Sequence, residues 1–411
     1  MSSQKVLRIA YFAEIFPSKS ETWVHHEILE LQRLGCIVRV FATHPRPKSV
    51  PDELRGLFAI TSYLPELSCS LSTALLQILK PCLLLPVARG LMCDAKGLRR
   101  KAQVCRDLIY AGLFRPFVTD FRPDCLFAHF GGTRTNLAMF CSMLSGLPFG
   151  FKMHAADVFR RVGLFRLKVA RSAQIMTISR YNIEFIKEHY QDIDTSLFQE
   201  HACGIPLHDY PYQPSRQESE VPTILGVGRL VRMKGFDVLL RASRLLLDLG
   251  FRHRVVLIGH GPEREALEQL CLSLGLQDTV AFKGYVGPHE VRSILISSTV
   301  FVLPAVWDPI DNTQDGVPVA LMEAMALGVP VVSTTTSGIS ELVEAGVTGF
   351  LARPNDHVDL AAQVRCCCEL DDESREIMLA AARRKVEQDH DVRNLTLTLF
   401  GMLKQAVGSD D

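Results

Sequence analysis

Residues 315–332 read DGVPVALMEAMALGVPVV, and this stretch says most about the fold. It predicts a loop, a helix over 318–327 and a buried strand over 329–333. Asp315 lies at the end of the loop, and Glu323 lies eight residues later, about two helical turns on. A carboxylate buried among alanines needs a partner, which the hydroxyls of a ribose or another sugar could supply. The alternative is an exposed glutamate on an ordinary amphipathic helix.

The same alternation of strand and helix continues on both sides of this stretch. In the first half, a strand at 6–12, a helix at 23–34 and a strand at 37–42 form a βαβ unit, which implies a parallel sheet. The other predicted strands are 125–128, 149–153, 175–178, 198–202, 223–228, 254–258, 280–282 and 300–303, and the other predicted helices are 262–274, 289–297 and 371–404.

A polar segment at 212–221 contains no apolar run and predicts a linker between two domains. We therefore expect an α/β protein with two Rossmann-like domains that face a cleft. The expected boundaries are 1–215 for the first domain and 222–385 for the second. A final helical segment at 386–411 is expected to pack back toward the first domain.

Composition excludes several classes of protein. The 45 Lys and Arg residues balance 45 Asp and Glu residues, so charge alone would not hold the chain on nucleic acid. The twelve cysteines are scattered without a C-x-x-C pair, and the start lacks a signal-peptide core, so we expect reduced thiols in a cytoplasm. The most apolar stretch, 67–91, is interrupted by polar residues and prolines, so we expect no transmembrane segment.

Two glycine-rich loops follow predicted strands of the second half. In the first loop, Gly228 and Arg229 are followed by Lys234 at the start of a helix, an arrangement that suits a diphosphate. In the second loop, Gly259 and Gly261 fit either a ligand site or a tight βα turn. Open α/β sheets bind ligands where such loops lie, at the carboxyl ends of the strands.

A metal site is not expected. Residues 311–316 imitate the opening of a calcium loop, but the twelfth position is Met322 rather than a glutamate.

Taken in order, these segments resemble the nucleotide-sugar glycosyltransferases of the GT-B fold, in particular the large retaining group called family 4. The resemblance is carried by residues 226–235, 259–262, 282–286, 315–332, 337–343 and 346–351. In the first half, residues 15–24, 128–131, 153–157 and 178–182 resemble members that build bacterial exopolysaccharides or lipopolysaccharides.

The resemblance implies a role for each matching residue. Arg229 and Lys234 would hold the donor diphosphate, Glu323 the ribose, and Asp315 the hydroxyls of the transferred sugar. His154 would lie near that sugar across the cleft. The implied catalytic residues are Arg229, Lys234, Asp315 and His154. The remaining implied contacts are Gly228, Gly259, Gly261, Gly284 and Val286 for the donor, with the base read partly by backbone at 284–286, and His129 for the acceptor.

Two positions depart from the family pattern. The first acid is Asp315 where Glu is usual, which shortens the reach toward the sugar by one methylene group. The paired glycines that many members carry after the first strand are replaced by residues 18–20, Ser-Lys-Ser, which weakens the case for phosphate contacts from that side.

The implied reaction is that of a retaining hexosyltransferase. It moves a sugar from a nucleotide-sugar donor, a UDP-sugar in preference to a GDP-sugar, to a hydroxyl of a glycan or lipid-linked acceptor in cell-surface polysaccharide or glycolipid synthesis. No cofactor and no nucleic-acid partner are expected. Two alternatives remain: a non-hydrolysing nucleotide-sugar 2-epimerase, and an inactive GT-B-like partner subunit.

Between residues 67 and 113, apolar clusters alternate with Lys80, Arg89, Lys96, Arg99, Arg100 and Lys101. Such a segment could lie in the interface of an anionic membrane, or it could form core helices with a solvated basic face. Because lipid-linked acceptors are common among the relatives that build exopolysaccharides, we favour peripheral contact at the inner face of the cell membrane.

Overall fold

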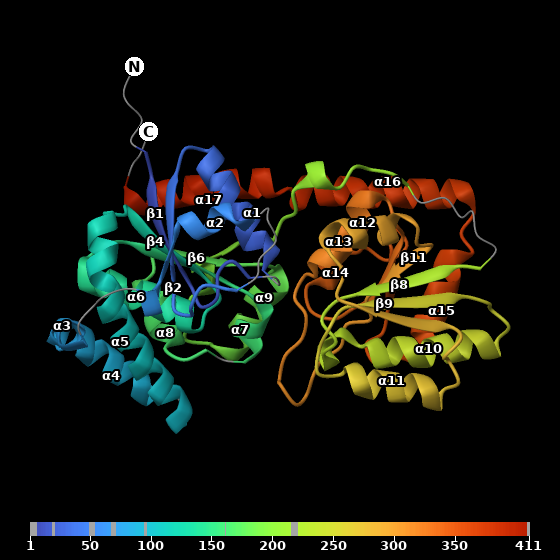
Figure 1. The fold of residues 1–411 in the computed structure, drawn as a ribbon, viewed down its shortest axis with the longest axis horizontal. Helices are drawn as coiled ribbons and strands as arrows, with labels where there is room; N and C mark the ends of the chain where they lie inside the picture. Colours follow the sequence, from blue (N-terminus) through green and yellow to red (C-terminus); the bar gives the residue numbers. More distant parts are fainter. Residues whose placement is uncertain are drawn as a thin grey trace, which may run out of the picture. The chain divides into compact units, whose positions relative to one another are not determined.

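The computed structural model describes residues 6–18, 21–48, 54–66, 71–93, 97–160, 162–214 and 221–408. The chain forms two compact units, each built around one parallel sheet (Figure 1). Unit 1 comprises Met1–His201 with Val392–Asp411, and unit 2 comprises Ala202–Asp391. The predicted α/β fold class with two Rossmann-like domains is confirmed.

The sheet of unit 1 has the order β3-β2-β1-β4-β5-β6-β7 within the described residues, and every pairing is parallel. Its strands are β1 (Arg8–Ala13), β2 (Ile37–Ala42), β3 (Thr61–Tyr63), β4 (Cys125–His129), β5 (Phe149–Met153), β6 (Gln174–Thr177) and β7 (Phe198–Glu200). Its helices are α1 (Thr22–Arg33), α2 (Gly56–Ala59), α3 (Leu71–Ile78), α4 (Pro81–Cys93), α5 (Leu98–Phe121), α6 (Thr133–Ser145), α7 (Ala155–Phe159), α8 (Phe165–Arg171), α9 (Arg180–His189) and α17 (Val392–Val407).

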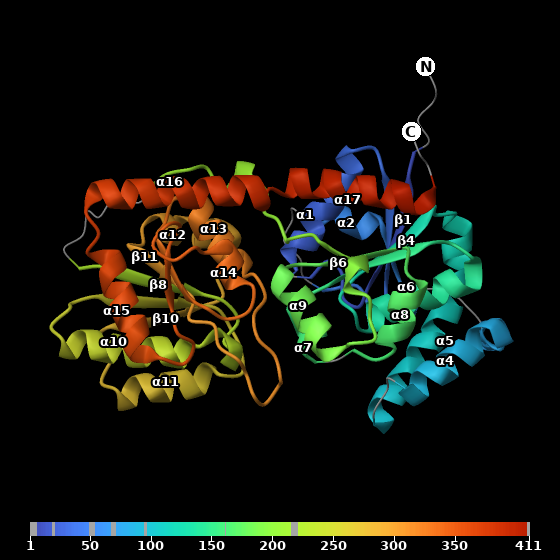
Figure 2. The ribbon, with the colours of Figure 1, turned by 180° about the vertical axis from the view of Figure 1, so that it is seen from behind.

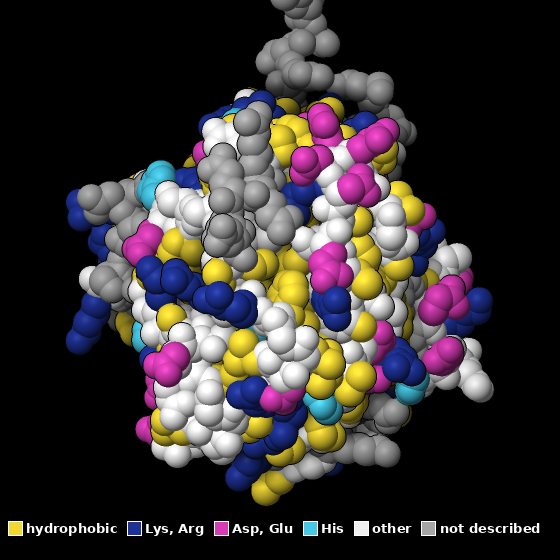
Figure 3. Space-filling view, turned by 90° about the vertical axis from the view of Figure 1, so that its right-hand side faces the viewer, with side chains coloured by type: hydrophobic (Ala, Val, Ile, Leu, Met, Phe, Trp, Pro, Cys, Tyr) yellow, Lys and Arg dark blue, Asp and Glu magenta, His cyan; other side chains and the backbone are white. Residues whose placement is uncertain are grey.

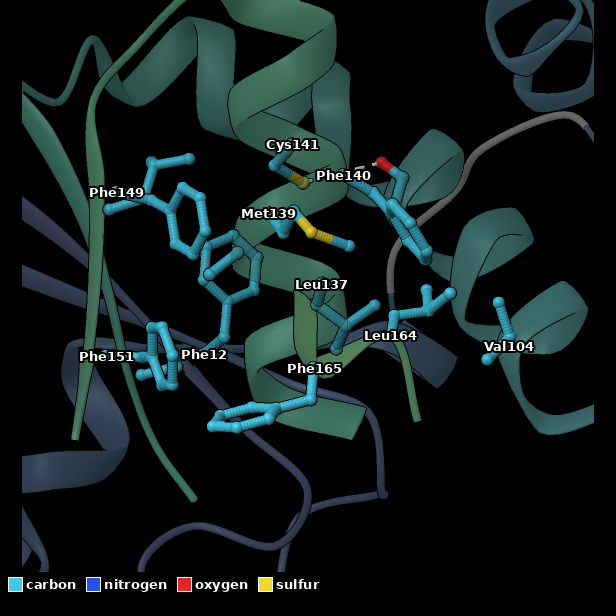
Figure 4. Close-up of a cluster of buried hydrophobic side chains, with 14 of the residues drawn as sticks. Phe12, Val104, Leu137, Met139, Phe140, Cys141, Phe149, Phe151, Leu164 and Phe165 are labelled. Atoms are coloured by element: carbon cyan, nitrogen blue, oxygen red, sulfur yellow. Dashed lines mark hydrogen bonds between the residues drawn. The ribbon is translucent and has the colours of Figure 1, made fainter. Parts of the chain in front are cut away.

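Two hydrophobic cores cover the two faces of this sheet. Because side chains alternate along a strand, Tyr11 of β1 enters one core with Leu399 and Leu403 of α17. Its neighbour Phe12 enters the other core, which gathers around α6 (Figure 4). Helix α6 is buried almost all round, and Gly146 ends it in the left-handed region at a φ of 76°.

The sheet of unit 2 has the order β10-β9-β8-β11-β12-β13, again parallel throughout the described residues. Its strands are β8 (Thr223–Val227), β9 (Arg254–Ile258), β10 (Val280–Gly284), β11 (Val300–Val302), β12 (Val331–Thr334) and β13 (Phe350–Ala352). Its helices are α10 (Phe236–Asp248), α11 (Arg264–Ser273), α12 (Pro288–Ile296), α13 (Val319–Leu327), α14 (Ile339–Leu342), α15 (His357–Cys368) and α16 (Asp372–Asp389).

Helices cover both faces of the second sheet. Helices α10 and α11 lie on one side, below the strands in Figures 1 and 2, and α12 and α13 lie on the other. Apart from Glu323, the α13 sequence VALMEAMAL is apolar all round, as expected of a helix enclosed by its own unit. The face of the molecule in Figure 3 carries positive, negative and apolar side chains interspersed, in line with the net charge of zero.

The predicted helix at 371–404 is in fact two helices, α16 and α17, separated by His390 and Asp391. His390 makes hydrogen bonds through both its backbone and its side chain. Its carbonyl accepts from the amide of Ile205, and its ring Nδ1 lies 2.9 Å from the carbonyl oxygen of Cys203. These contacts with an extended segment interrupt the helix, and helical periodicity alone could not show them.

Two other expectations concern segments of which the structure describes only a part. Residues 215–220 of the predicted linker lie outside them, as do Lys19 and Ser20. Among the described helices, none has the length and apolar character needed to cross a membrane.

Candidate functional site

Lys234, predicted to hold the diphosphate, and Asp315, predicted to hold the sugar, lie against each other in unit 2. The Nζ atom of Lys234 is 2.6 Å from Oδ2 of Asp315, and both side chains are more than four-fifths buried. Lys234 ends a 3₁₀ turn, Arg232–Lys234, just before α10. A negatively charged ligand beside Lys234 would form a second ion pair with the ammonium that already contacts Asp315.

Gly235 lets the chain enter α10 at that point. Its φ is +67°, and a Cβ atom there would lie 1.9 Å from the carbonyl oxygen of Pro304. Only glycine meets both conditions. The start of α10 and Lys234 are thus fixed against the loop that follows β11. The predicted diphosphate ligand Arg229 is exposed on the loop after β8.

The glycines of the two loops bring those loops together. A Cβ atom on Gly259 would lie 1.8 Å from the carbonyl oxygen of Gly228, and one on Gly261 would lie 2.1 Å from that of Leu230. The amide of Leu230 donates to the carbonyl of His260 at 2.9 Å. The close approach of the two loops therefore accounts for glycine at positions 259 and 261, and a donor contact through them stays a prediction.

Glu323 finds a partner inside unit 2 that the sequence did not indicate. Its Oε1 accepts a hydrogen bond from the hydroxyl of Tyr210 at 2.8 Å. Burial raises the pKa of Glu323, while the Tyr210 hydrogen bond and the charge of Arg292 act in the opposite direction. The alternative of an exposed glutamate is wrong, and no motif indicated Tyr210 as the partner of Glu323.

The end of β12 and the loop after it are tied to the loop after β11 by hydroxyl groups. Ser333 donates to the carbonyl of Leu303 at 2.6 Å, and Thr336 donates to that of Ala305 at 2.8 Å. Ser337 follows with a φ of +53°, and its buried Oγ has no hydrogen-bond partner among the described residues. Two further predicted donor contacts lie elsewhere on the sheet. Gly284 ends β10, where its carbonyl accepts from the amide of Gly259 at 2.8 Å, and Val286 lies in the loop that follows.

In unit 1, the two predicted histidines lie together at the ends of adjacent strands. Nδ1 of His129, the last residue of β4, is 3.2 Å from Nε2 of His154, which follows β5. On its other side, Nε2 of His129 is 2.7 Å from Oε1 of Glu27 on α1. All three side chains are buried.

The carboxylate assigns the first proton of this chain. An ionised Glu27 only accepts, so His129 donates to it through Nε2, and one of the two facing nitrogens of His129 and His154 donates to the other. Tyr11 also donates to Glu27, at 2.9 Å. Burial alone would raise the pKa of Glu27, but His129, Lys152 and His201 together lower it to about 2.

A buried lysine completes the group. Nζ of Lys152 lies 3.8 Å from Oε2 of Glu27 and donates to Nδ1 of His201 at 2.9 Å. Burial, with the charge of Lys152, lowers the pKa of His201 to about 3, and burial also lowers that of His154. Both imidazoles are therefore neutral near pH 7. The sequence analysis did not identify Glu27 or Lys152 as members of this group. Glu27 lies on an amphipathic helix and Lys152 on a buried strand, and neither pattern distinguishes them.

We expect thermal stability to decrease as the pH falls below about 6.5. The folded-state pKa values of His154 and His201 lie below the unfolded value, so their stabilising effect is complete above pH 6.5 and is lost on acidification. Glu27 adds a loss of the same sign between about pH 4.5 and 2.

Melting temperatures measured from pH 8 to pH 4 would show this effect. Replacing His201 with Asn should flatten the profile, and replacing the exposed His208 with Gln should leave it unchanged. A melting temperature that rises on acidification would contradict the assignment.

No group of three or more His, Cys, Asp or Glu side chains that could hold a metal ion occurs within the described ranges.

The comparisons with known proteins concern both units. Residues 213–385 match the family model "Glycosyl transferases group 1". The chain is 28% identical to WcaL of Escherichia coli strain K12, over 97% of this chain and all of that protein, whose name assigns it provisionally to colanic acid biosynthesis as a glycosyltransferase. It is 29% identical to the amylovoran biosynthesis glycosyltransferase AmsK of Erwinia amylovora, over 93% of this chain and 96% of that one.

A solved structure shows the same fold over the whole chain. The structure of Anabaena Alr3699/HepE in complex with UDP aligns with a TM-score of 0.72 at 17% identity, and covers 97% of this chain and all of that one. The fold is GT-B, and unit 2 carries a glycosyltransferase group 1 domain.

Proposed function

Because residues 213–385 form a glycosyltransferase group 1 domain, we propose that the chain transfers a hexosyl group from a nucleotide sugar to an acceptor hydroxyl, with retention at the anomeric carbon. Unit 2 binds the donor and unit 1 the acceptor. The product is a cell-surface polysaccharide or glycolipid, made in the cytoplasm. Family 4 is the group that this reaction and the matching residues indicate.

The observation that carries the proposal is the Lys234–Asp315 pair at the start of α10. Charge develops on the departing diphosphate, and an ammonium beside the first amides of a helix stabilises that charge. Arg229 would add a second cation. HepE, a protein of the same fold, was solved with UDP and with UDP-glucose, which supports a UDP-sugar as donor.

Asp315, Glu323 and His154 complete the proposed site. Asp315 orients Lys234 and accepts from hydroxyls of the sugar. Glu323 binds the ribose through the oxygen that Tyr210 does not use. The neutral imidazole of His154 contacts the sugar, and His129 contacts the acceptor. Backbone around Gly228, Gly284 and Val286 binds the nucleotide.

The test measures nucleotide release from UDP-glucose and other nucleotide sugars, with and without an acceptor glycan. A transferase releases nucleotide faster when acceptor is present, and it yields an α-linked product from an α-linked donor. A 2-epimerase would convert donor without acceptor, and an inactive partner subunit would release nothing. Either of those outcomes would overturn the proposal. The relatives named as glycosyltransferases favour neither alternative.

We also propose that helices α3 to α5 contact an anionic membrane surface. Helix α4 buries Leu83 and Val87 in the core of unit 1, whereas Leu85 and Met92 are 62% and 75% exposed. The exposed side chains of Arg89, Arg99 and Lys101 lie on the same pair of helices, α4 and α5. Residues 67–70 and 94–96, including Lys96, lie outside the described ranges.

We expect the protein to co-sediment with vesicles of anionic lipid at low salt and to be released at high salt. Each basic residue near such a surface adds about 1 kcal/mol, so changing Arg89, Arg99 and Lys101 together to Glu should abolish sedimentation. The matched control changes three exposed arginines of unit 2 to Glu, namely Arg241, Arg252 and Arg254. Wild-type protein that stays in the supernatant at low salt would exclude the membrane proposal.

A further inference from the structure

Unit 1 contains a cavity of about 460 Å³ that none of the assignments above uses. It is lined by the first turns of α5, α6 and α7, by residues 160, 162 and 163 after α7, and by Lys168 of α8. The volume falls within the range of small-ligand sites.

Positive charge prevails around this cavity. The cations that line it are Arg100, Arg134, Arg160 and Lys168, against the acids Glu14 and Asp157. Arg134 is already paired with Glu21 through two contacts of 2.8 Å. Lys168 is fully buried, and its ammonium donates to the carbonyls of Gly131 and Gly163 at 2.6 Å. The lining therefore favours an anion.

The start of α6 adds to this preference. Gly132 precedes the helix, and no side chain caps its first amides. Gly132, Thr133 and Arg134 all line the cavity, so the positive end of a 13-residue helix borders it. Amides at such an end bind phosphate and carboxylate groups.

A buried polar atom at the cavity lacks a hydrogen-bond partner in the part of the chain that the structure describes. Asn136 lines the cavity with 3% of its surface exposed, and its Oδ1 has no hydrogen-bond partner. Its Nδ2 already donates to Asp107 at 2.7 Å, so Oδ1 is left to accept from a hydroxyl. The Nε atom of Arg134 has no hydrogen-bond partner but lies 3.8 Å from Oε2 of Glu14, so Arg134 is paired within the protein. Asn136 therefore calls for a ligand hydroxyl, and Arg100 and Arg160 favour an anionic group on the same ligand.

Two residues that line the cavity contact His154. The ring of Phe130 lines the cavity and stacks on the imidazole of His154, with 4.3 Å between centroids. Asp157 lines the cavity too, and its carboxylate accepts from the amide of His154 at 2.9 Å. A ligand here would be separated from the proposed sugar contact by one ring.

We propose that this cavity binds the phosphate and neighbouring hydroxyls of a phosphorylated saccharide, which serves as the acceptor. The inference rests on the proposed glycosyl transfer, because it names the class of acceptor that unit 1 takes. Arg100 and Arg160 pair with the phosphate, the start of α6 donates to it, and Asn136 accepts from a sugar hydroxyl.

Calorimetric titration of the full chain with glucose 1-phosphate tests the site, with glucose as the uncharged comparison. We expect binding of glucose 1-phosphate and none of glucose. Arg100→Gln and Arg160→Gln should each weaken binding about tenfold to a hundredfold, as loss of a charge-assisted hydrogen bond does. Arg171→Gln, exposed at the end of α8 and outside the cavity lining, is the matched control and should bind as wild type. Equal affinity in all three variants would overturn the proposal.

A second measurement separates this proposal from the proposed function. UDP binding to unit 2 should be unchanged in Arg100→Gln and Arg160→Gln. If UDP binds but no sugar phosphate does, the transferase proposal stands and the cavity proposal fails. Comparing glucose 1-phosphate with a polyprenyl diphosphate-linked sugar as acceptor identifies the source of the phosphate. If sugar is transferred to either acceptor and the KM for that acceptor is raised in the two variants, the site is supported. If sugar is transferred and the KM for the acceptor is unchanged, the site is refuted.

Discussion

Replacing Lys234 with Ala should lower turnover by about 100-fold to 1,000-fold while the fold stays intact. The side chain stabilises charge on the leaving diphosphate, and loss of one such donor typically costs about 2.7–4 kcal/mol of transition-state stabilisation. Arg229→Ala should lower turnover in the same direction, and because Arg229 is exposed we expect the smaller of the two effects. The measurement is kcat for nucleotide release with saturating donor.

Arg232 provides the control for this prediction. It lies in the same 3₁₀ turn as Lys234 but faces Glu263, 3.4 Å away, with 55% of its side chain exposed. Arg232→Ala should keep near-normal turnover. If Lys234→Ala also turns over normally, Lys234 does not hold the diphosphate, and the Lys234–Asp315 pair is only structural.

Replacing Glu27 with Ala should lower the free energy of unfolding by about 3–5 kcal/mol. The change leaves Lys152 and His129 buried without the carboxylate that faces them, and removing one partner of a buried ion pair typically has this effect. Trp23 on α1 lies 5.8 Å from His154 between ring centroids and reports on this region. Urea unfolding followed by Trp23 fluorescence, in a Trp307→Phe background, isolates its signal because the chain has two tryptophans.

Glu30 on the same helix is the matched control. Its partner Arg33 is 59% exposed, so Glu30→Ala should cost less than about 1 kcal/mol. A Glu27→Ala variant as stable as Glu30→Ala would show that the buried network adds nothing to the stability of unit 1.

Periodicity predicted the interior strands with bounds close to those observed, because each of them is a short apolar run. The predicted strands 37–42, 149–153 and 254–258 coincide with β2, β5 and β9. The edge strands β3 and β13 were missed. The ordered motifs identified the fold because they mark the loops at the carboxyl ends of the strands.

Side-chain partners from distant segments could not be predicted. The hydrogen bond between Tyr210 and Glu323 joins residues 113 positions apart, and that between Glu27 and His129 joins residues 102 apart. No local signal distinguishes Glu27 from a solvated glutamate on an amphipathic helix. The Lys234–Asp315 pair was not anticipated either, although both residues were assigned to the site.

The core of unit 1 draws on the two ends of the chain, and this bears on how the protein is made. Leu399 and Leu403 of α17 pack with Tyr11 and Ile28, yet Ala202–Asp391 are translated in between. At roughly 5–20 residues per second, the ribosome takes tens of seconds to cross that interval. For this time the apolar surface that α17 covers on α1, β4 and β6 stays exposed to solvent, and unit 2 can fold first even though it is encoded second. A chaperone would find its binding surface there.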